Sequence, residues 1–339
     1  MDERFLSLLS SIRAKQSHLR SSAISMRREK PDLVRKVHQS KSPALSLSVC
    51  AVDGGLVSQR MHGSDIVITR AVGVHFVYDG SRLVSFDHFP SKSVEPVIEF
   101  KNALDEHEAN VFKSLIRLKH ELSCAISILE KYSPDLLLLD GSLWLVPSDR
   151  PQSGSELAPL YQEVVSLFKK LYSLCGVKRG DKAQTRLCGV IKDSRSRKLA
   201  RDLGLDCSDT VLCRYMLEAG ERTAVMPYFD DEQKEPDGFA KRLKAFYLKP
   251  SEQDLPLRVE FLGDDGHQGD AGKTPGSEED SVASLIHSLS SISESFAYPA
   301  ILVEADMCAA MDSREIEHIQ NQLSSLDIQP LRRNSRPFR

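Results

Sequence analysis

The sequence predicts an α/β protein in which a mixed sheet is flanked by helices, with a helical extension at the N-terminus. Short apolar runs of strand length alternate with longer amphipathic segments of helical spacing. An early pair of strands joined by a tight turn adds antiparallel pairing to that alternation. A length of 339 residues is enough for one large domain or two ordinary ones.

Composition is ordinary for a soluble globular protein, with 41% hydrophobic and 27% charged residues. No apolar run approaches the roughly 18 residues that span a bilayer. The first 20 residues place acids before apolar positions, which indicates an amphipathic helix and not a signal peptide. We therefore expect a cytoplasmic protein with no membrane segment.

The seven cysteines are scattered along the chain, and none forms a CxxC pair. This distribution argues against a disulfide framework and against a zinc site.

The net charge of −3 does not indicate nucleic-acid binding. Basic residues nevertheless concentrate between Lys182 and Arg201 and in the C-terminal tail. Local basic patches suit a phosphate backbone, although solvated surface is the simpler alternative.

The first half of the chain predicts a helix, then a meander of strands. Residues 1 to about 40 carry apolar side chains at helical spacing. Leu45–Val52 follows as a buried strand, which Gly54 and Gly55 are expected to end. Strands are expected at Ser64–Val77 and at Arg82–Phe86, with Tyr78–Ser81 as the hairpin turn between them.

The central elements alternate between helix and strand. Ala103–Lys131 has a 3,4,3,4 apolar spacing, which predicts a helix that Ser133-Pro134 ends. Leu136–Leu139 is the next strand, Glu156–Leu174 the next amphipathic helix, and Leu187–Ile191 a short strand.

The last third predicts a helix at Thr210–Glu218 and a strand at Leu257–Leu262. Gly263–Ser281 is rich in glycine and acids, so we expect a disordered insertion. A helix is expected at Ser281–Ser295. Tyr298-Pro299 is expected to begin a strand over Ala300–Val303, with another helix from near Glu304. The expected organisation is an N-terminal helical extension (1–42), one α/β domain (43–312, including the insertion at 263–281) and a C-terminal helix with a basic tail (313–339).

Two apolar strands in this sequence run into Asp-Gly, at Asp53 and at Asp140. An aspartate at the rim of a sheet projects a carboxylate from a rigid position, and glycine permits a sharp turn. If the strands are neighbours, the two carboxylates repel unless a cation lies between them. Oxygen ligands suit Mg²⁺ or Mn²⁺, which can promote phosphodiester hydrolysis. Asp-Gly is also a common turn pair, and that alternative stays open.

A third carboxylate is expected from the helix that leads into the Asp140 strand. Glu121 lies at the edge of its apolar stripe, and an i,i+4 pair with Arg117 is its alternative role. Glu108 and Glu130 are the other candidates on the same helix.

Together these residues resemble the NurA family of DNA nucleases. The resemblance extends over about residues 48–312, through "AVDGGLVSQRMHGSDIVITRAVGV", "IRLKHELSCAISILEKYSPDLLLLDGSL", "LCGVIKDSRSRKLA", "RVEF" and "YPAILVEAD" in this order. It implies a ribonuclease H-like fold and a Mn²⁺-dependent (or Mg²⁺-dependent) nuclease acting on DNA ends and single strands. It also implies a homodimer that works with HerA, a hexameric DNA-translocating ATPase, in DNA end resection and repair.

The resemblance implies that Asp53, Glu121 and Asp140 bind the metal, and that Lys192 faces the phosphate. Tyr298 matches the late tyrosine of the family, and the resemblance implies a catalytic set of Asp53, Glu121, Asp140, Lys192 and Tyr298. Eight residues later the family commonly has histidine, whereas this chain has Asp306. Aspartate can still bind a metal through oxygen, so Asp306 is expected as a further ligand.

Local roles remain open for several of these residues. Asp193 or Ser194 could cap a helix, Tyr298 could be a core aromatic, and Asp306 could be an acid at a helix start.

Two other functions of the protein also remain open. One is a non-catalytic DNA-binding adaptor of a translocase, and the other is a different ribonuclease H-like nuclease.

Overall fold

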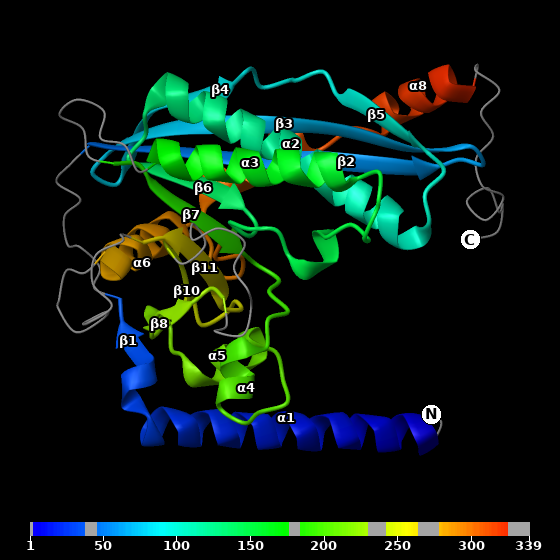
Figure 1. The fold of residues 1–339 in the computed structure, drawn as a ribbon. Helices are drawn as coiled ribbons and strands as arrows, with labels where there is room; N and C mark the ends of the chain where they lie inside the picture. The colour runs from blue at the N-terminus through cyan, green and yellow to red at the C-terminus, as the bar shows by residue number, and fades with distance from the viewer. Residues whose placement is uncertain (1–2, 38–45, 176–183, 230–241, 264–277, 325–339) are drawn as a thin grey trace. The chain divides into compact units, whose positions relative to one another are not determined.

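The computed structural model describes residues 3–37, 46–175, 184–229, 242–263 and 278–324. The chain divides into two compact units (Figure 1). Unit 1 contains Met1–Lys41 and Gly189–Ala300, and unit 2 contains Ser42–Cys188 and Ile301–Arg339. The expected α/β class with a mixed sheet, flanking helices and an N-terminal helix is confirmed.

The sheet of unit 2 carries the two Asp-Gly strands. Its strand order is β6-β2-β3-β4, and β5 also pairs with β3. β2 pairs with β6 in parallel and with β3 in antiparallel fashion, so the sheet is mixed as expected. The bounds are Ser46–Arg60 for β2, Ser64–Asp79 for β3, Arg82–Phe89 for β4, Val97–Asn102 for β5 and Leu136–Asp140 for β6.

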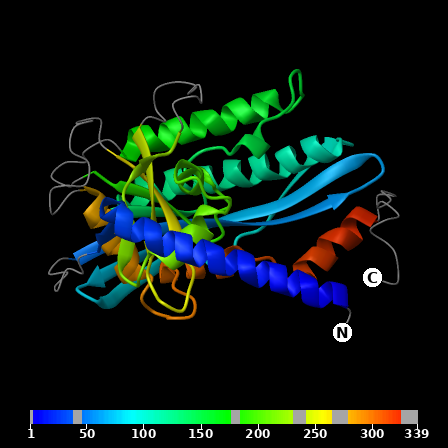
Figure 2. The ribbon, with the colours of Figure 1, turned by 90° about the horizontal axis from the view of Figure 1, so that it is seen from below.

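Strand β2 does not end at Gly54 and Gly55, so that prediction is wrong. β3 pairs with β2 along its whole length, from Ser46 opposite Asp79 to Arg60 opposite Asp65. Glycine weakens a strand but does not end one whose partner continues. Beyond the end of β6 the two strands continue as a long ribbon (Figure 2).

Two long helices cover one face of this sheet, α2 (Glu106–Tyr132) and α3 (Ala158–Cys175) (Figure 1). Asp105 caps the start of α2 by accepting a 2.8 Å hydrogen bond from the amide of Glu108. The helix ends at Ser133, which has a left-handed φ of 45° and directly precedes Pro134. The predicted helices at Ala103–Lys131 and Glu156–Leu174 are thereby confirmed.

Two further helices complete unit 2, α7 (Ala300–Ala309) and α8 (Ser313–Ser324). The strand predicted at Ala300–Val303 is wrong, because this whole segment is helical. A short apolar run does not distinguish a strand from a buried helix, and Pro299 suits the start of a helix. The buried positions show helical spacing: Ile301, Leu302, Ala305, Cys308 and Ala309. α8 packs Ile319 against Ile66 and Ile68 of the β2–β3 ribbon.

Unit 1 is built on an antiparallel sheet with the order β1-β8-β10-β11, and β9 pairs with β10. The bounds are Val34–Lys36 for β1, Glu221–Thr223 for β8, Met226–Pro227 for β9, Leu243–Lys249 for β10 and Leu257–Leu262 for β11. The helices that follow α1 in this unit are α4 (Lys198–Asp202), α5 (Asp209–Met216) and α6 (Glu278–Leu289). β7 (Arg186–Ile191) contains the boundary between the units.

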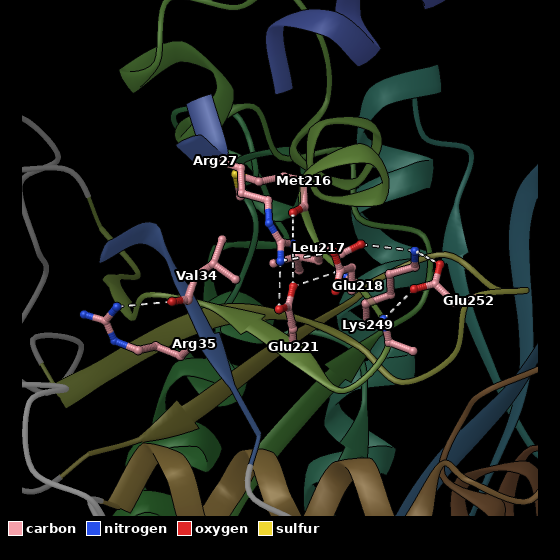
Figure 3. Close-up of polar contacts among 10 residues, drawn as sticks. Arg27, Val34, Arg35, Met216, Leu217, Glu218, Glu221, Lys249 and Glu252 are labelled. Carbon is pink, nitrogen blue, oxygen red and sulfur yellow. Dashed lines mark hydrogen bonds and ion pairs between the residues drawn. The ribbon is translucent and has the colours of Figure 1, made fainter. Parts of the chain in front are cut away.

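Helix α1 (Glu3–Glu29) belongs to unit 1, and its C-terminal part holds it there. Ala23 is fully buried in a core cluster with α4 and α5, against which Leu19 also packs. Arg27 donates to both carboxylate oxygens of Glu221, at 2.6 and 3.0 Å, and to the carbonyl of Met216 (Figure 3). A bidentate pair of this kind is among the stronger ion pairs, since one partner is buried.

Some expectations lie on residues outside the described ranges. The basic tail lies there, as does most of the expected insertion at Gly263–Ser281. Within its described part, helix α6 already begins at Glu278, earlier than predicted. No helix among the described residues is both long and apolar enough to cross a bilayer.

Candidate metal centre

Asp53 and Asp140 lie on neighbouring strands at the point where β6 ends. The last pair in the parallel register is Val52 opposite Leu139, so the two aspartates are the next residues on each strand. Asp140 is the last residue of β6, which extends one residue beyond the predicted end at Leu139. Asp53 lies inside β2 and is buried, and its Oδ1 accepts a 2.7 Å hydrogen bond from the amide of Gly54.

Glu121 approaches β2 from helix α2, directly beside Asp53. A Cβ atom on Gly54 would lie 2.5 Å from Oε1 of Glu121, so only glycine leaves room for this carboxylate. Glu121 is buried, and Nη1 of Arg117 lies 3.3 Å from its Oε1. Glu121 therefore forms the alternative i,i+4 ion pair with Arg117 and also lies against β2.

The two other candidate glutamates of this helix have different surroundings. Glu108 accepts hydrogen bonds from the amide of Gln152 at 2.8 Å and from the hydroxyl of Ser155. Glu130 is exposed and lies 3.9 Å from Lys170. Glu121 is thus the one of the three that the packing of α2 brings to β2.

Burial and mutual repulsion raise the pKa values of these carboxyls. Burial raises the pKa of Asp53 to about 7, and the charge of Asp140 adds to this increase. Burial likewise raises the pKa of Glu121 to about 8, while the charge of Arg117 opposes the change. The pKa of Arg117 is itself raised, first by Glu121 and also by Asp53 and Asp140. These carboxyls are close enough to interact, and a bound cation would favour their charged forms.

Helix α7 brings a fourth carboxyl to the same place. The Asp306 carboxyl interacts with that of Asp53, and this interaction raises the pKa of Asp53. The last turn of α7 packs directly on β2, because a Cβ on Gly55 would overlap the carbonyl oxygen of Ala309. Asp306 therefore lies near the other acids as expected. It is placed there by helix α7, and not by a strand followed by a helix as predicted.

The residues fit a divalent cation that prefers oxygen ligands. Four carboxyls from a strand, a helix, a strand end and a second helix lie close enough to act on one another's charge: Asp53, Glu121, Asp140 and Asp306. Oε1 of Glu121 is buried, and its ion pair with Arg117 is not accompanied by a hydrogen bond within the described part of the chain. Carboxylate ligands suit Mg²⁺ and Mn²⁺.

Lys192 and Tyr298 lie together within unit 1. The Lys192 ammonium is 4.9 Å from the centre of the Tyr298 ring, a cation–π distance. The buried Tyr298 donates its hydroxyl to the carbonyl of Val190 at 3.0 Å. The core-aromatic alternative for Tyr298 is confirmed, and the same ring also holds the lysine.

The loop after Lys192 is held by buried residues that sequence reasoning missed. Thr210 donates to the carbonyl of Ser194 at 2.9 Å, and the Asp209 amide donates to Ser196 at 2.8 Å. Asp209 is fully buried and accepts from the hydroxyl of Tyr247 at 3.0 Å. Tyr247 lies on β10, a strand that was not predicted, so its partnership with Asp209 had no sequence signal.

The alternative role of Asp193 or Ser194 as a helix N-cap is not found in the structure. Helix α4 begins at Lys198, and its N-cap position is Arg197. Ser194 is instead part of the loop itself, where its hydroxyl lies 3.4 Å from that of Tyr247.

A group of carboxylates of this kind on a mixed sheet is typical of metal-dependent phosphodiester hydrolases, the class that includes many nucleases. A family model described as the NurA domain matches residues 47–310 of this chain. The chain belongs to the NurA domain family, as its sequence motifs predicted. No protein with curated annotation matches the chain significantly.

Solved structures of NurA proteins have the same fold at low sequence identity. The NurA nuclease from Sulfolobus solfataricus is 15% identical, with a TM-score of 0.58 over 96% of this chain and 97% of its own. A NurA structure with manganese is 12% identical, with a TM-score of 0.56 over 95% and 98% of the two chains. A NurA bound to dAMP and manganese is 10% identical, with a TM-score of 0.54 over 94% and 96%. The expected Mn²⁺ is thus the ion found in structures of this family.

Proposed function

We propose that this chain is a divalent-metal-dependent deoxyribonuclease that acts on single-stranded DNA and on DNA ends. The observation that carries the proposal is the convergence of Asp53, Glu121 and Asp140, with raised pKa values for the first two. Membership of the NurA domain family supports the same activity. Mn²⁺, or Mg²⁺ in its place, is the proposed cofactor.

Each residue has a defined part in this proposal. Asp53, Glu121, Asp140 and Asp306 would hold the metal, which when bound activates water and stabilises charge at phosphorus. Arg117 offsets part of the negative charge and fixes the Glu121 carboxylate through their ion pair. Lys192, held over the Tyr298 ring, would bind the phosphate of the DNA strand.

The biological setting is proposed from family membership. We infer a role in DNA end resection and repair as a homodimer, together with a HerA-type hexameric ATPase. The described basic residues of the segment after β7 (Lys192, Arg195, Arg197, Lys198 and Arg201) suit contacts with a phosphate backbone.

The test is Mn²⁺-dependent degradation of end-labelled single- and double-stranded DNA. The wild type should cleave, and Asp140→Ala should not. Asp79→Ala is the matched control, because Asp79 precedes a glycine in the exposed hairpin turn and should leave cleavage intact. Glu121→Gln and Glu130→Gln form a second pair on one helix, of which only the first should lose activity. Undiminished cleavage by both Asp140→Ala and Glu121→Gln would refute the proposal.

The alternative function is a non-catalytic DNA-binding adaptor, which the aspartate at position 306 favours because the family commonly has histidine there. An adaptor of this kind would show no cleavage and no stabilisation by Mn²⁺. A Mn²⁺-dependent increase in Tm that Asp53→Ala abolishes would reject it. Comparing DNA with RNA and RNA–DNA hybrids separates the proposed activity from that of other ribonuclease H-like nucleases.

A further inference from the structure

We infer that His88, Glu304 and Cys308 form a second metal site in unit 2, suited to a Zn²⁺-class ion and separate from the acidic centre. Their ligand atoms all lie within 4.8 Å of one another. Nε2 of His88 is 2.9 Å from Oε1 of Glu304, and the Cys308 sulfur is 3.6 Å from the same oxygen. This inference goes beyond the proposed nuclease function and does not depend on it.

Backbone geometry sets the three side chains in place. Glu304 and Cys308 are four residues apart on α7, so they share one face of this helix. His88 lies near the end of β4, opposite Val74 of β3. Cys308 packs in one cluster with Val72 of β3, so α7 lies against this part of the sheet.

The ligand set differs in kind from that of the acidic centre. Imidazole, thiolate and carboxylate are the ligands of Zn²⁺, whereas oxygen ligands alone suit Mg²⁺ and Mn²⁺. Tetrahedral bonds of about 2.0 Å to nitrogen and oxygen and about 2.3 Å to sulfur place neighbouring ligand atoms roughly 3.3–3.5 Å apart. The observed separations from Glu304, 2.9 and 3.6 Å, are close to these values, and the ligand atoms of His88 and Cys308 lie within 4.8 Å of each other.

The site is enclosed but reachable from solvent. The side chains of His88 and Glu304 are 10% and 30% exposed, and Cys308 is buried. Without a metal, the thiol of Cys308 donates to Glu304. Binding would release this thiol proton to solvent and leave the thiolate on the ion. Lys92 is the cation near Cys308, and since it is exposed its side chain can turn away.

A metal at this site would hold the helix that carries Asp306. Asp306 lies between Glu304 and Cys308 in the chain, and its carboxyl interacts with that of Asp53. A metal bound by Glu304 and Cys308 of α7 and by His88 of β4 would restrict the position of the Asp306 carboxyl between them. The sequence did not indicate this site, because CxxC patterns detect only ligands that are close in the chain. His88 and Glu304 are 216 residues apart.

The test uses Co²⁺ as a spectroscopic substitute for Zn²⁺. The double variant Asp53→Asn/Asp140→Asn removes two of the four carboxylates of the acidic centre and should lack nuclease activity, so its result does not depend on that activity. This protein should bind one equivalent of Co²⁺ with a sulfur-to-metal charge-transfer absorption, and added Zn²⁺ should remove that absorption. The acidic centre contains no thiolate and cannot produce it.

Further variants assign the absorption to the three residues. Cys308→Ser should abolish it, whereas Cys124→Ser, which changes another buried cysteine of the same unit, should retain it. Glu304→Gln keeps a hydrogen-bonding partner for His88 and should weaken Co²⁺ binding at least about tenfold. If Cys308→Ser does not fold, Glu304→Gln decides. A folded double variant without the absorption, or an absorption that Glu304→Gln leaves unchanged, would overturn the inference.

Discussion

The two Asp-Gly pairs of this protein are the same dipeptide, but glycine is needed at the two positions for different structural reasons. At Asp53-Gly54 the strand continues, and the glycine leaves space for the Glu121 carboxylate. At Asp140-Gly141 the strand ends, Gly141 has a φ of +134°, and nothing lies within 4 Å of a Cβ built there. The first glycine therefore serves packing, and the second serves backbone conformation.

This difference shows how the two aspartates come together. Asp140 is at the rim because its strand stops there. Asp53 is in the middle of its strand, and it becomes available because β6 no longer covers that side of β2. The end of a strand and the end of strand pairing are two ways to present a carboxylate beside a rigid core.

The largest expected effect follows from removing the charge of Asp53. Asp53→Asn should lower Mn²⁺-dependent cleavage by at least about 10²–10³-fold, as for loss of a group that stabilises a transition state. The Tm of the metal-free protein should rise at a pH above 7, by about 2–4 °C for each kcal/mol of repulsion relieved. Nuclease assays and thermal unfolding measure both effects. A lower metal-free Tm would show that repulsion does not act on this carboxyl.

The two glycines should differ when each is replaced by alanine. Gly54→Ala would displace the Glu121 carboxylate, so we expect weaker Mn²⁺ binding and loss of most activity. Gly141→Ala should cost about 1–3 kcal/mol of stability because alanine is strained at its φ. Activity per folded molecule should persist in Gly141→Ala, since the new methyl group meets nothing. Calorimetric Mn²⁺ titration and urea unfolding separate the two, and equal Mn²⁺ affinities would contradict the comparison.

The raised pKa values predict how pH acts on the metal-free protein. Asp53 and Glu121 keep protons up to about pH 7 and 8 when folded, whereas unfolded carboxyls release them near pH 4. The folded state therefore binds more protons in this window, and its unfolding free energy should fall as pH rises through it.

Mn²⁺ binding should show the opposite trend, because the ion must displace those protons. Its affinity should rise with pH by up to about tenfold per unit for each proton released, and level off above the raised pKa values. Isothermal titration from pH 5 to 9 measures this, with Asp53→Asn as the comparison. An affinity independent of pH would show that both carboxyls are already ionised without metal.

The smallest expected effect concerns position 306. Asp306→His replaces an oxygen ligand by imidazole, which suits transition metals better than Mg²⁺. The ratio of Mn²⁺-supported to Mg²⁺-supported cleavage should rise about a few-fold. Parallel assays in the two metals measure this ratio. An unchanged ratio would place Asp306 outside the metal's ligands.

Much of the fold followed from local patterns. The Ala103–Lys131 helix, the Leu136–Leu139 strand and the hairpin turn at Tyr78–Ser81 all lie where periodicity and turn residues predicted them. Two errors, the end of β2 and the helix at Ala300–Val303, share one cause. In both segments the neighbour in space, and not the local residue types, decides the conformation.

By itself, the sequence determined which carboxylates are candidates, because apolar strands running into Asp-Gly and a helix with Glu121 at its stripe are local patterns. Only the tertiary structure decided that these groups meet. Their proximity depends on a parallel register, on a glycine that admits a carboxylate, and on the packing of α7 against β2. The His88–Glu304–Cys308 cluster is likewise a product of packing, since residues so distant in the chain interact only once the core has formed.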